Sequence, residues 1–189
     1  MAAAGVVYGL YNVSLTTILA YGPLMLVERG WTFAAASSVT SLVLWIVTLS
    51  LPGGGYLADR TGQRGLILVG GLFVFSAAMA LAPRTDAALP VFALLGIASG
   101  LPCGAIMSLP TRILSPATRA ARMGILLTVY YVINVCGPWL IGRIAELSGS
   151  PRFAFDVSAI ALCGAIVFWF IFRRLANRSS IAEEAKAAG

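Results

Sequence analysis

The sequence predicts an all-α integral membrane protein in which six transmembrane helices form one bundle, and three observations predict it. Hydrophobic residues make up 59% of the 189-residue chain, and its mean hydropathy is +0.91, whereas soluble domains are about 45–50% apolar. Long stretches carry almost no charge, and about 20 helical residues are enough to cross a bilayer core about 30 Å thick. The cations gather in the segments between these stretches.

The first three spans are expected at 4–27, 33–57 and 65–82. The start Met-Ala-Ala-Ala lacks the positive charge of a signal peptide, and the apolar run after it is too long for one, so we expect this span to be retained. The turn 28–32 and the loop 58–64 are both short, which makes successive helices antiparallel neighbours.

The other three spans are expected at 88–111, 123–142 and 153–174. The connection 112–122 is longer than the others and contains Ser115-Pro116, a favoured helix start. The last low-charge run, 156–172, is short for a span unless the residues from Phe153 are included. The segment 177–189 is polar and rich in Ala and Glu, which indicates a cytoplasmic tail or a short surface helix.

The distribution of cations predicts the orientation of the bundle. The loops 58–64 and 112–122 and the chain end contain nine of the thirteen cations: Arg60, Arg64, Arg112, Arg119, Arg122, Arg173, Arg174, Arg178 and Lys186. The opposite turns contain four: Arg29, Arg84, Arg143 and Arg152. By the positive-inside rule both termini are cytoplasmic, and we expect a multi-pass protein of the plasma membrane, the inner membrane of a bacterium. This distribution also accounts for the net charge of +6 without a nucleic-acid partner.

Composition excludes several kinds of chemistry. The chain has no histidine, which argues against His-based catalysis and most zinc or haem sites, so we expect no enzyme, metal or cofactor. The cysteines Cys103, Cys136 and Cys163 lie inside apolar spans, so we expect each to be a small buried hydrophobic residue rather than part of a disulfide. No Asp, Glu, Lys or Arg lies in the middle of a span, which favours a neutral or weakly polar solute, or a uniporter or exchanger.

The polar segment 55–64 is the most informative motif. Ionised side chains cost about 2.5–3.5 kcal/mol each inside a bilayer, so this segment lies outside it. Its sequence resembles the G-x-L-A-D-R-x-G-R-K/R loop between the second and third helices of each half of a major facilitator superfamily transporter. Gln63 departs from that pattern, and the matching residues are Gly55, Leu57, Asp59, Arg60, Gly62 and Arg64.

The resemblance extends over nearly the whole chain. Cys136-Gly137-Pro138 with Gly142 is similar to the Gly-Pro motif of the family's fifth or eleventh helix, and the run 142–155 is similar to the external loop before the last helix. Tyr21-Gly22-Pro23 looks like the end of helix seven. At the place where N-terminal halves often carry an Arg, four residues before Gly100, this chain has Gly96. The resemblance therefore favours a single six-helix half of the C-terminal type.

Polar residues of two spans are candidate substrate ligands. In the family the first helix of each half lines the central cavity, and spacing of four residues places side chains on one helix face. The candidates are Tyr8, Asn12 and Thr16 in the first span and Tyr130, Tyr131 and Asn134 in the fifth. The alternative is interhelical hydrogen bonding that only holds the bundle together. Trp45 is a weaker candidate, because a Trp in the middle of a span more often packs against its neighbours.

The fourth span carries Gly96, Gly100 and Gly104 at intervals of four residues, which predicts close helix packing. Pro102 and Pro110 in the same span remove backbone hydrogen bonds and can bend it. Packing is preferred over a gating bend.

The resemblance implies a conformational latch on the cytoplasmic side, formed by Gly55, Asp59, Arg60, Gly62, Arg64 and Arg112. In the family the acid of the motif engages a cation at the end of the fourth helix, here Arg112, and the start of a helix of the opposite half. The alternative for Arg112 is an interfacial anchor. The alternative for Asp59 is an ion pair with Arg60 or Arg64 that orders the loop.

The resemblance also implies how the chain works. Two six-helix halves of one orientation make a complete transporter, so two copies related by a twofold axis would form a parallel homodimer with twelve helices in the bilayer. Alternating access by rocking would then move a small polar solute. The alternatives are a fragment of a longer transporter, a subunit that pairs with a different half, a non-transporting receptor or assembly subunit, and an intramembrane enzyme.

Overall fold

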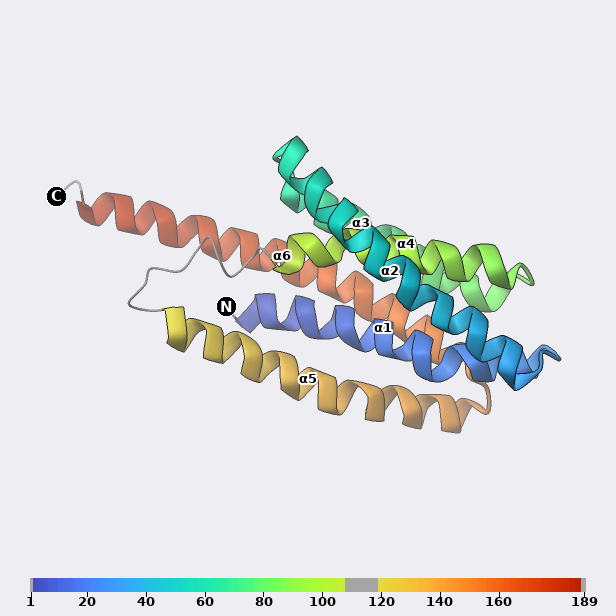
Figure 1. Cartoon of the computed structure of the whole chain (residues 1–189). Helices are drawn as coiled ribbons and strands as arrows, with labels where there is room; N and C mark the ends of the chain where they lie inside the picture. The colour runs from blue at the N-terminus through green and yellow to red at the C-terminus, as the bar shows by residue number, and fades with distance from the viewer. Residues whose placement is uncertain (1, 108–118, 188–189) are drawn as a thin grey trace.

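The computed structural model describes residues 2–107 and 119–187, which form six α-helices and one short 3-10 helix. In chain order these are α1 (Ala2–Glu28), α2 (Phe33–Thr61), α3 (Arg64–Leu81), η1 (Ala82–Arg84), α4 (Ala88–Met107), α5 (Arg119–Ser148) and α6 (Arg152–Ala187). The helices form an elongated bundle with both chain ends at one end, the termini end, and the α1–α2, α3–α4 and α5–α6 turns at the other, the turn end (Figure 1). The expected all-α architecture is confirmed for the described ranges.

Membrane-spanning character is clear for five of these helices. α1, α2 and α5, together with the segments Arg64–Arg84 and Arg152–Arg174, are long and apolar enough to cross a bilayer, and α4 contributes a shorter apolar helix over Ala88–Cys103. The residues from Ser108 to Thr118, which include Pro110 and Arg112, lie outside the described residues.

Glycines with a left-handed backbone set where three helices end. Gly30, Gly62 and Gly149 follow α1, α2 and α5 with φ values of 87°, 65° and 67°, a conformation that costs glycine nothing. The sequence indicated a loop over 58–64, but α2 continues through Asp59 and Arg60 to Thr61, and α3 starts two residues after Gly62. α6 is one helix of 36 residues, about 54 Å at 1.5 Å per residue, so 177–187 continues the last span.

Two pairs of parallel helices meet at glycines. A Cβ on Gly9 of α1 would lie 2.8 Å from the Ile133 Cβ of α5, and a Cβ on Gly96 of α4 would lie 2.7 Å from the Ile46 Cβ of α2. Such contacts leave no room for a side chain, so the backbones approach closely. The packing interpretation is confirmed for Gly96 and for Gly100, where an added Cβ would collide with Ser50. The surroundings of Gly104 lie outside the described residues.

Hydroxyl groups join α1 and α3 to α6. Ser158 Oγ donates to Thr17 Oγ1 at 2.9 Å, and Ser76 Oγ donates to the Ala159 carbonyl at 2.8 Å. These side chains are buried, and every buried side-chain polar atom in the described residues has a hydrogen-bond partner. Lipid tails are as apolar as the helix surfaces, so the hydrophobic effect does not drive helices together in a bilayer. Hydrogen bonds such as these contribute to helix association there.

The three turns at the turn end are tied to each other by polar contacts. The Arg29 guanidinium donates to the carbonyls of Ala82, Pro83 and Thr85 at 3.1, 2.7 and 2.6 Å. Arg84 pairs with Asp156 of α6 at 2.6 Å. The α1–α2, α3–α4 and α5–α6 regions are therefore held together at this end.

The cysteines correct one prediction made from the sequence. All three thiols are free, as expected, and Cys103 is buried, but Cys136 and Cys163 are exposed at the bundle surface. A position in an apolar span does not tell whether a side chain faces other helices or the surroundings, because lipid is as apolar as a protein core.

Helices α2 and α5 are the least covered parts of the bundle. In the most apolar segment of each helix, the buried share is 22% for α2 and 11% for α5, against 44%, 44% and 39% for α1, α3 and α6. α5 lies against α1 and, less extensively, α6, whereas α2 lies against α4 and α1. In Figure 1, α2 and α5 flank α1 on opposite sides.

Candidate functional site

The site is built on the parallel helices α1 and α5. The rings of Tyr8 and Tyr130 stack with their centroids 4.4 Å apart and their planes 19° from parallel. Tyr131 meets Tyr130 edge to face at 5.0 Å. The structure therefore brings together three of the aromatic candidates from two spans that are more than 100 residues apart in the chain.

Close packing of the helices explains this contact. Gly5 and Gly9 of α1 face Leu126, Val129 and Ile133 of α5 so tightly that a Cβ would lie 2.7–2.8 Å from the nearest atom. Tyr8 and Tyr130 project from the edge of this seam and remain half-buried. An offset stack of two such rings is a favourable arrangement.

The two asparagines lie one helical turn beyond the stacked rings. Asn12 follows Tyr8 by four residues and Asn134 follows Tyr130 by four, so on parallel helices both are placed on the same side of the seam. Asn134 Nδ2 donates to the Tyr130 carbonyl at 3.0 Å, which satisfies part of that amide within its own helix. The half-buried Asn12 amide has no hydrogen-bond partner among the described residues.

The uncovered face of α1 continues beyond Asn12. Thr16 is exposed, and its hydroxyl donates to the Asn12 carbonyl at 3.0 Å. By contrast, Tyr11, Ser14 and Thr17 are buried, and their hydroxyl groups have hydrogen-bond partners on α4 or α6. Among the described residues, the face of α1 that carries Tyr8, Asn12 and Thr16 is therefore only partly covered, by Tyr130 of α5 at Tyr8, and it is exposed at Thr16.

Two residues lie in surroundings that the sequence did not indicate. Trp45 was expected to pack against neighbours, but it is 73% exposed on the surface of α2, so packing within this chain does not explain it. Tyr11 was not among the candidates from the sequence, and its hydroxyl donates to the Ser99 carbonyl of α4 at 2.9 Å. Tyr11 and Ser99 lie on different helices, so no local pattern in the sequence indicated this contact.

The residues expected to form a latch, apart from Arg112, lie at or near the α2–α3 junction. Asp59 forms an ion pair with Arg64 within the chain, which is one of the two arrangements considered from the sequence. Arg60 is exposed, and a Cβ on Gly55 would meet no described atom within 4 Å. Gly54, not Gly55, packs on α4, with a Cβ placed 2.6 Å from the Leu101 carbonyl. Contact between Asp59 and Arg112 falls outside the described residues and stays a prediction.

Metal ions in proteins are held by groups of His, Cys, Asp or Glu side chains. Within residues 2–107 and 119–187, no group of three or more His, Cys, Asp or Glu side chains is placed to hold a metal ion. The candidate site offers phenol rings, amides and a hydroxyl group, which are hydrogen-bond donors and acceptors without a formal charge at neutral pH.

Apolar helices of membrane-spanning length define a helical membrane protein. The chain belongs to the Major Facilitator Superfamily, whose family profile matches residues 2–188. Among known proteins, the chain is similar to one from Arabidopsis thaliana described as "Probable anion transporter 4, chloroplastic", with 30% identity over 115 residues. That match covers 58% of this chain and 21% of the plant protein, so the chain corresponds to about a fifth of its length.

Proposed function

We propose that this chain is one half of a membrane transporter and that two copies pair in parallel to enclose a solute pathway between them. The pathway runs along the face of α1 that carries Tyr8, Asn12 and Thr16 and along the adjoining edge of α5. Rocking of one half against the other exposes the site to each side of the membrane in turn.

The observation that carries the proposal is the amide of Asn12, which is half-buried and has no hydrogen-bond partner among the described residues. An Asn side chain facing hydrocarbon leaves polar groups without partners, which is costly in a bilayer. Water or solute in a cavity closed by a second half removes that cost. The low coverage of the flanking helices α2 and α5 fits the same arrangement, because they would form the seams with the second half.

The composition of the site favours an uncharged polar solute. The stacked Tyr8–Tyr130 pair offers an aromatic surface next to the amides of Asn12 and Asn134. An anion, which the plant relative's description names, would need a cation in the pathway, and the described residues of the spans carry none away from their ends. The proposal therefore commits to a neutral or weakly polar solute.

A flux assay tests the assignment of the site. Asn12→Leu and Asn134→Leu remove hydrogen-bonding capacity at similar volume, so transport into proteoliposomes should fall while expression and thermal stability stay near those of the parent. Thr48→Val on α2 is the matched control, because Thr48 is exposed but bonds only its own helix, through the Leu44 carbonyl at 2.8 Å. Normal flux in both Asn variants would show that these amides are structural.

Measurement of the mass of the assembly tests the pairing. The chain has a mass of 19.8 kDa, so a parallel homodimer doubles it in mild detergent. Disulfide trapping tests whether α2 and α5 lie at the shared seam. One set of experiments uses a single cysteine at Trp45 and another uses a single cysteine at Val135, since both residues are strongly exposed. A monomer that transports would contradict the pairing and leave the site assignment open to the flux assay.

A further inference from the structure

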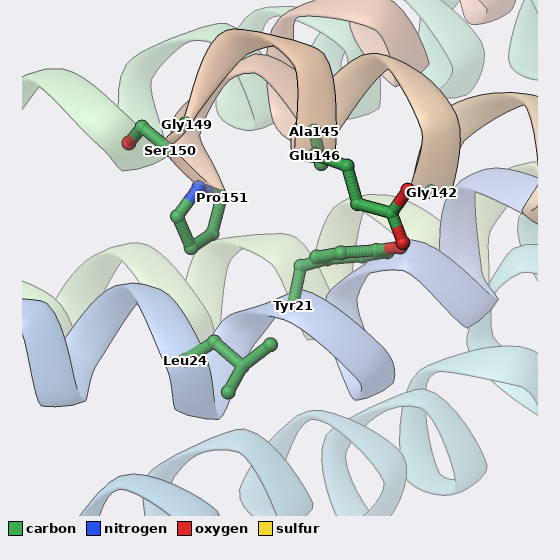
Figure 2. Close-up of a pocket in the computed structure, with 8 residues that line it drawn as sticks. All are labelled: Tyr21, Leu24, Gly142, Ala145, Glu146, Gly149, Ser150 and Pro151. Carbon is green, nitrogen blue, oxygen red and sulfur yellow. The ribbon is translucent and has the colours of Figure 1, made fainter.

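A cavity of about 330 Å³ lies at the turn end of the bundle, between the last turns of α1 and α5. Figure 2 shows Tyr21 and Leu24 of α1 on one side and Gly142, Ala145 and Glu146 of α5 on the other, with the α5–α6 turn closing one end. The α1–α5 seam, which is tight at Gly5 and Gly9, opens here into a space that the proposed solute pathway does not use.

The floor of the cavity depends on a missing side chain. A Cβ on Gly142 would lie 3.1 Å from the Tyr21 hydroxyl oxygen, so a larger residue here would press on the phenol head. The Tyr21 ring and the Glu146 side chain point toward one another in Figure 2. Together they place an aromatic ring, a hydroxyl and a carboxylate around one space.

Glu146 is the one charged side chain among the described residues that line this cavity. The Ser150 hydroxyl, which also lines it, donates to Glu28 at 3.4 Å. Arg143 pairs with Glu146 at 3.0 Å and balances one carboxylate. Arg29, the residue next to Glu28, is engaged with the carbonyls of the α3–α4 region instead.

One helix end adds negative potential at this cavity. α5 ends at Ser148, next to the lining residue Gly149, so the carbonyl end of its dipole lies at the cavity, whereas the lining residues of α1, Tyr21 and Leu24, precede its last turn. α5 has no basic residue in its last turn. A cation here gains from this helix end as well as from Glu146.

We propose that this cavity binds an organic ammonium group, such as the headgroup of an ethanolamine lipid or a free small amine. The lining of Leu24, Ala145 and Pro151 is apolar and contacts the carbon atoms of such a ligand, while the Tyr21 ring attracts its charge. A divalent metal ion fits poorly, because the described residues offer no third carboxylate or other metal-binding side chain there. The proposal does not depend on transport by this chain.

The test measures the thermal stability of the full-length protein in detergent while ethanolamine is added at constant ionic strength. Ethanolamine should raise the melting temperature in a saturable way, whereas ethylene glycol, its uncharged counterpart, should not. Glu146→Gln should weaken ethanolamine binding about fivefold to tenfold, because it removes a charge-assisted contact. Asp86→Asn is the matched control, since it removes an acid at the same end of the bundle outside the cavity, and it should leave binding unchanged.

A second variant keeps the test decisive if Glu146→Gln folds poorly. Leu24 is 46% exposed at the edge of the cavity, and Leu24→Trp fills the space without changing any charge, so it should abolish the ethanolamine effect. The proposal would be overturned if ethanolamine raised the melting temperature of the parent and of the cavity variant that folds by the same amount. It would also be overturned if ethylene glycol had the same effect as ethanolamine, or if the response to ethanolamine did not saturate.

Reconstitution then separates the two sources of the ammonium group. If a lipid supplies it, added ethanolamine should stabilise the protein in phosphatidylglycerol vesicles but not in vesicles that also contain phosphatidylethanolamine. If the ligand is a free amine, the effect should be the same in both. In either case, ethanolamine should stabilise the parent more than the cavity variant in phosphatidylglycerol vesicles.

Discussion

The contact between Tyr11 and α4 predicts a measurable restraint on that helix. Pro102 has no N–H group to donate to the Ala98 carbonyl, so α4 lacks one of its backbone hydrogen bonds at this level. The neighbouring Ser99 carbonyl accepts the Tyr11 hydroxyl at 2.9 Å, and Pro102 packs against α3 where a Cβ on Gly71 would lie 2.8 Å from it. The weakened turn of α4 is thus held from two sides, and Tyr11→Phe removes one of them.

The magnitude follows from burial. Tyr11 is 2% exposed, so no solvent replaces the lost hydrogen bond, but the Ser99 carbonyl keeps its position within a helix and is not stranded. We therefore expect a loss of about 1 kcal/mol, within the range of side-chain hydrogen bonds in membrane proteins. A loss of that size makes separation of α4 from α1 about fivefold more frequent.

Cys103 reports this separation directly, because it lies one residue after Pro102 and is 7% exposed. With Cys136 and Cys163 replaced by Ala, its maleimide labelling rate in detergent should rise about fivefold in Tyr11→Phe. Tyr131→Phe is the control, since Tyr131 is 61% exposed, and should leave the rate unchanged. An unchanged rate in Tyr11→Phe, or an equal rise in both variants, would refute the reasoning.

Three further substitutions test the packing, the turn end and the latch. Gly9→Val forces α1 away from Ile133 and should lower the free energy of unfolding by about 1–3 kcal/mol in an SDS titration, whereas Gly70→Val, with no described atom within 4 Å of an added Cβ, should not. Arg29→Gln breaks up to three hydrogen bonds to carbonyls and should cost about 2 kcal/mol; a change below the error of the titration would show that the turns are held by other contacts. Asp59→Asn should change stability by less than about 0.5 kcal/mol because its ion pair is largely exposed, but should increase labelling from the cytoplasmic side if the residue acts as a latch. Unchanged labelling would leave Asp59 as a residue that only orders the α2–α3 junction.

The helical architecture was predictable because hydropathy and charge act along the chain. Apolar runs define the helices, and the four-residue spacing of Gly96 and Gly100 predicted their role in packing, which the contacts with Ile46 and Ser50 confirm. The motif at 55–64 pointed to the right family. These features are local in sequence, so a single sequence contains them.

Which face of each helix is covered was less predictable. In a soluble protein an apolar side chain is usually inside, but lipid accepts apolar side chains as readily as a core does. Trp45, Cys136 and Cys163 were therefore assigned to the interior, although they lie on the surface. The stack of Tyr8 on Tyr130 required the register between α1 and α5, which Gly5, Gly9 and Gly137 set through contacts that no local pattern reveals.

The paired glycine seams have a consequence for the ancestry of the fold. α1 lies against α5 as α4 lies against α2, and α1 lies against α6 as α4 lies against α3. An exchange of the first three helices with the last three, α1 with α4, α2 with α5 and α3 with α6, keeps these neighbours. α1 starts at the termini end and α4 starts at the turn end (Figure 1), so the two sets of three helices run in opposite directions through the bundle. Such inverted symmetry is the product expected when a gene for three helices is duplicated and its second copy enters the membrane the opposite way round. The two seams occupy equivalent positions under this exchange, and in both of them glycines of the first helix of the three, α1 or α4, make the close contact.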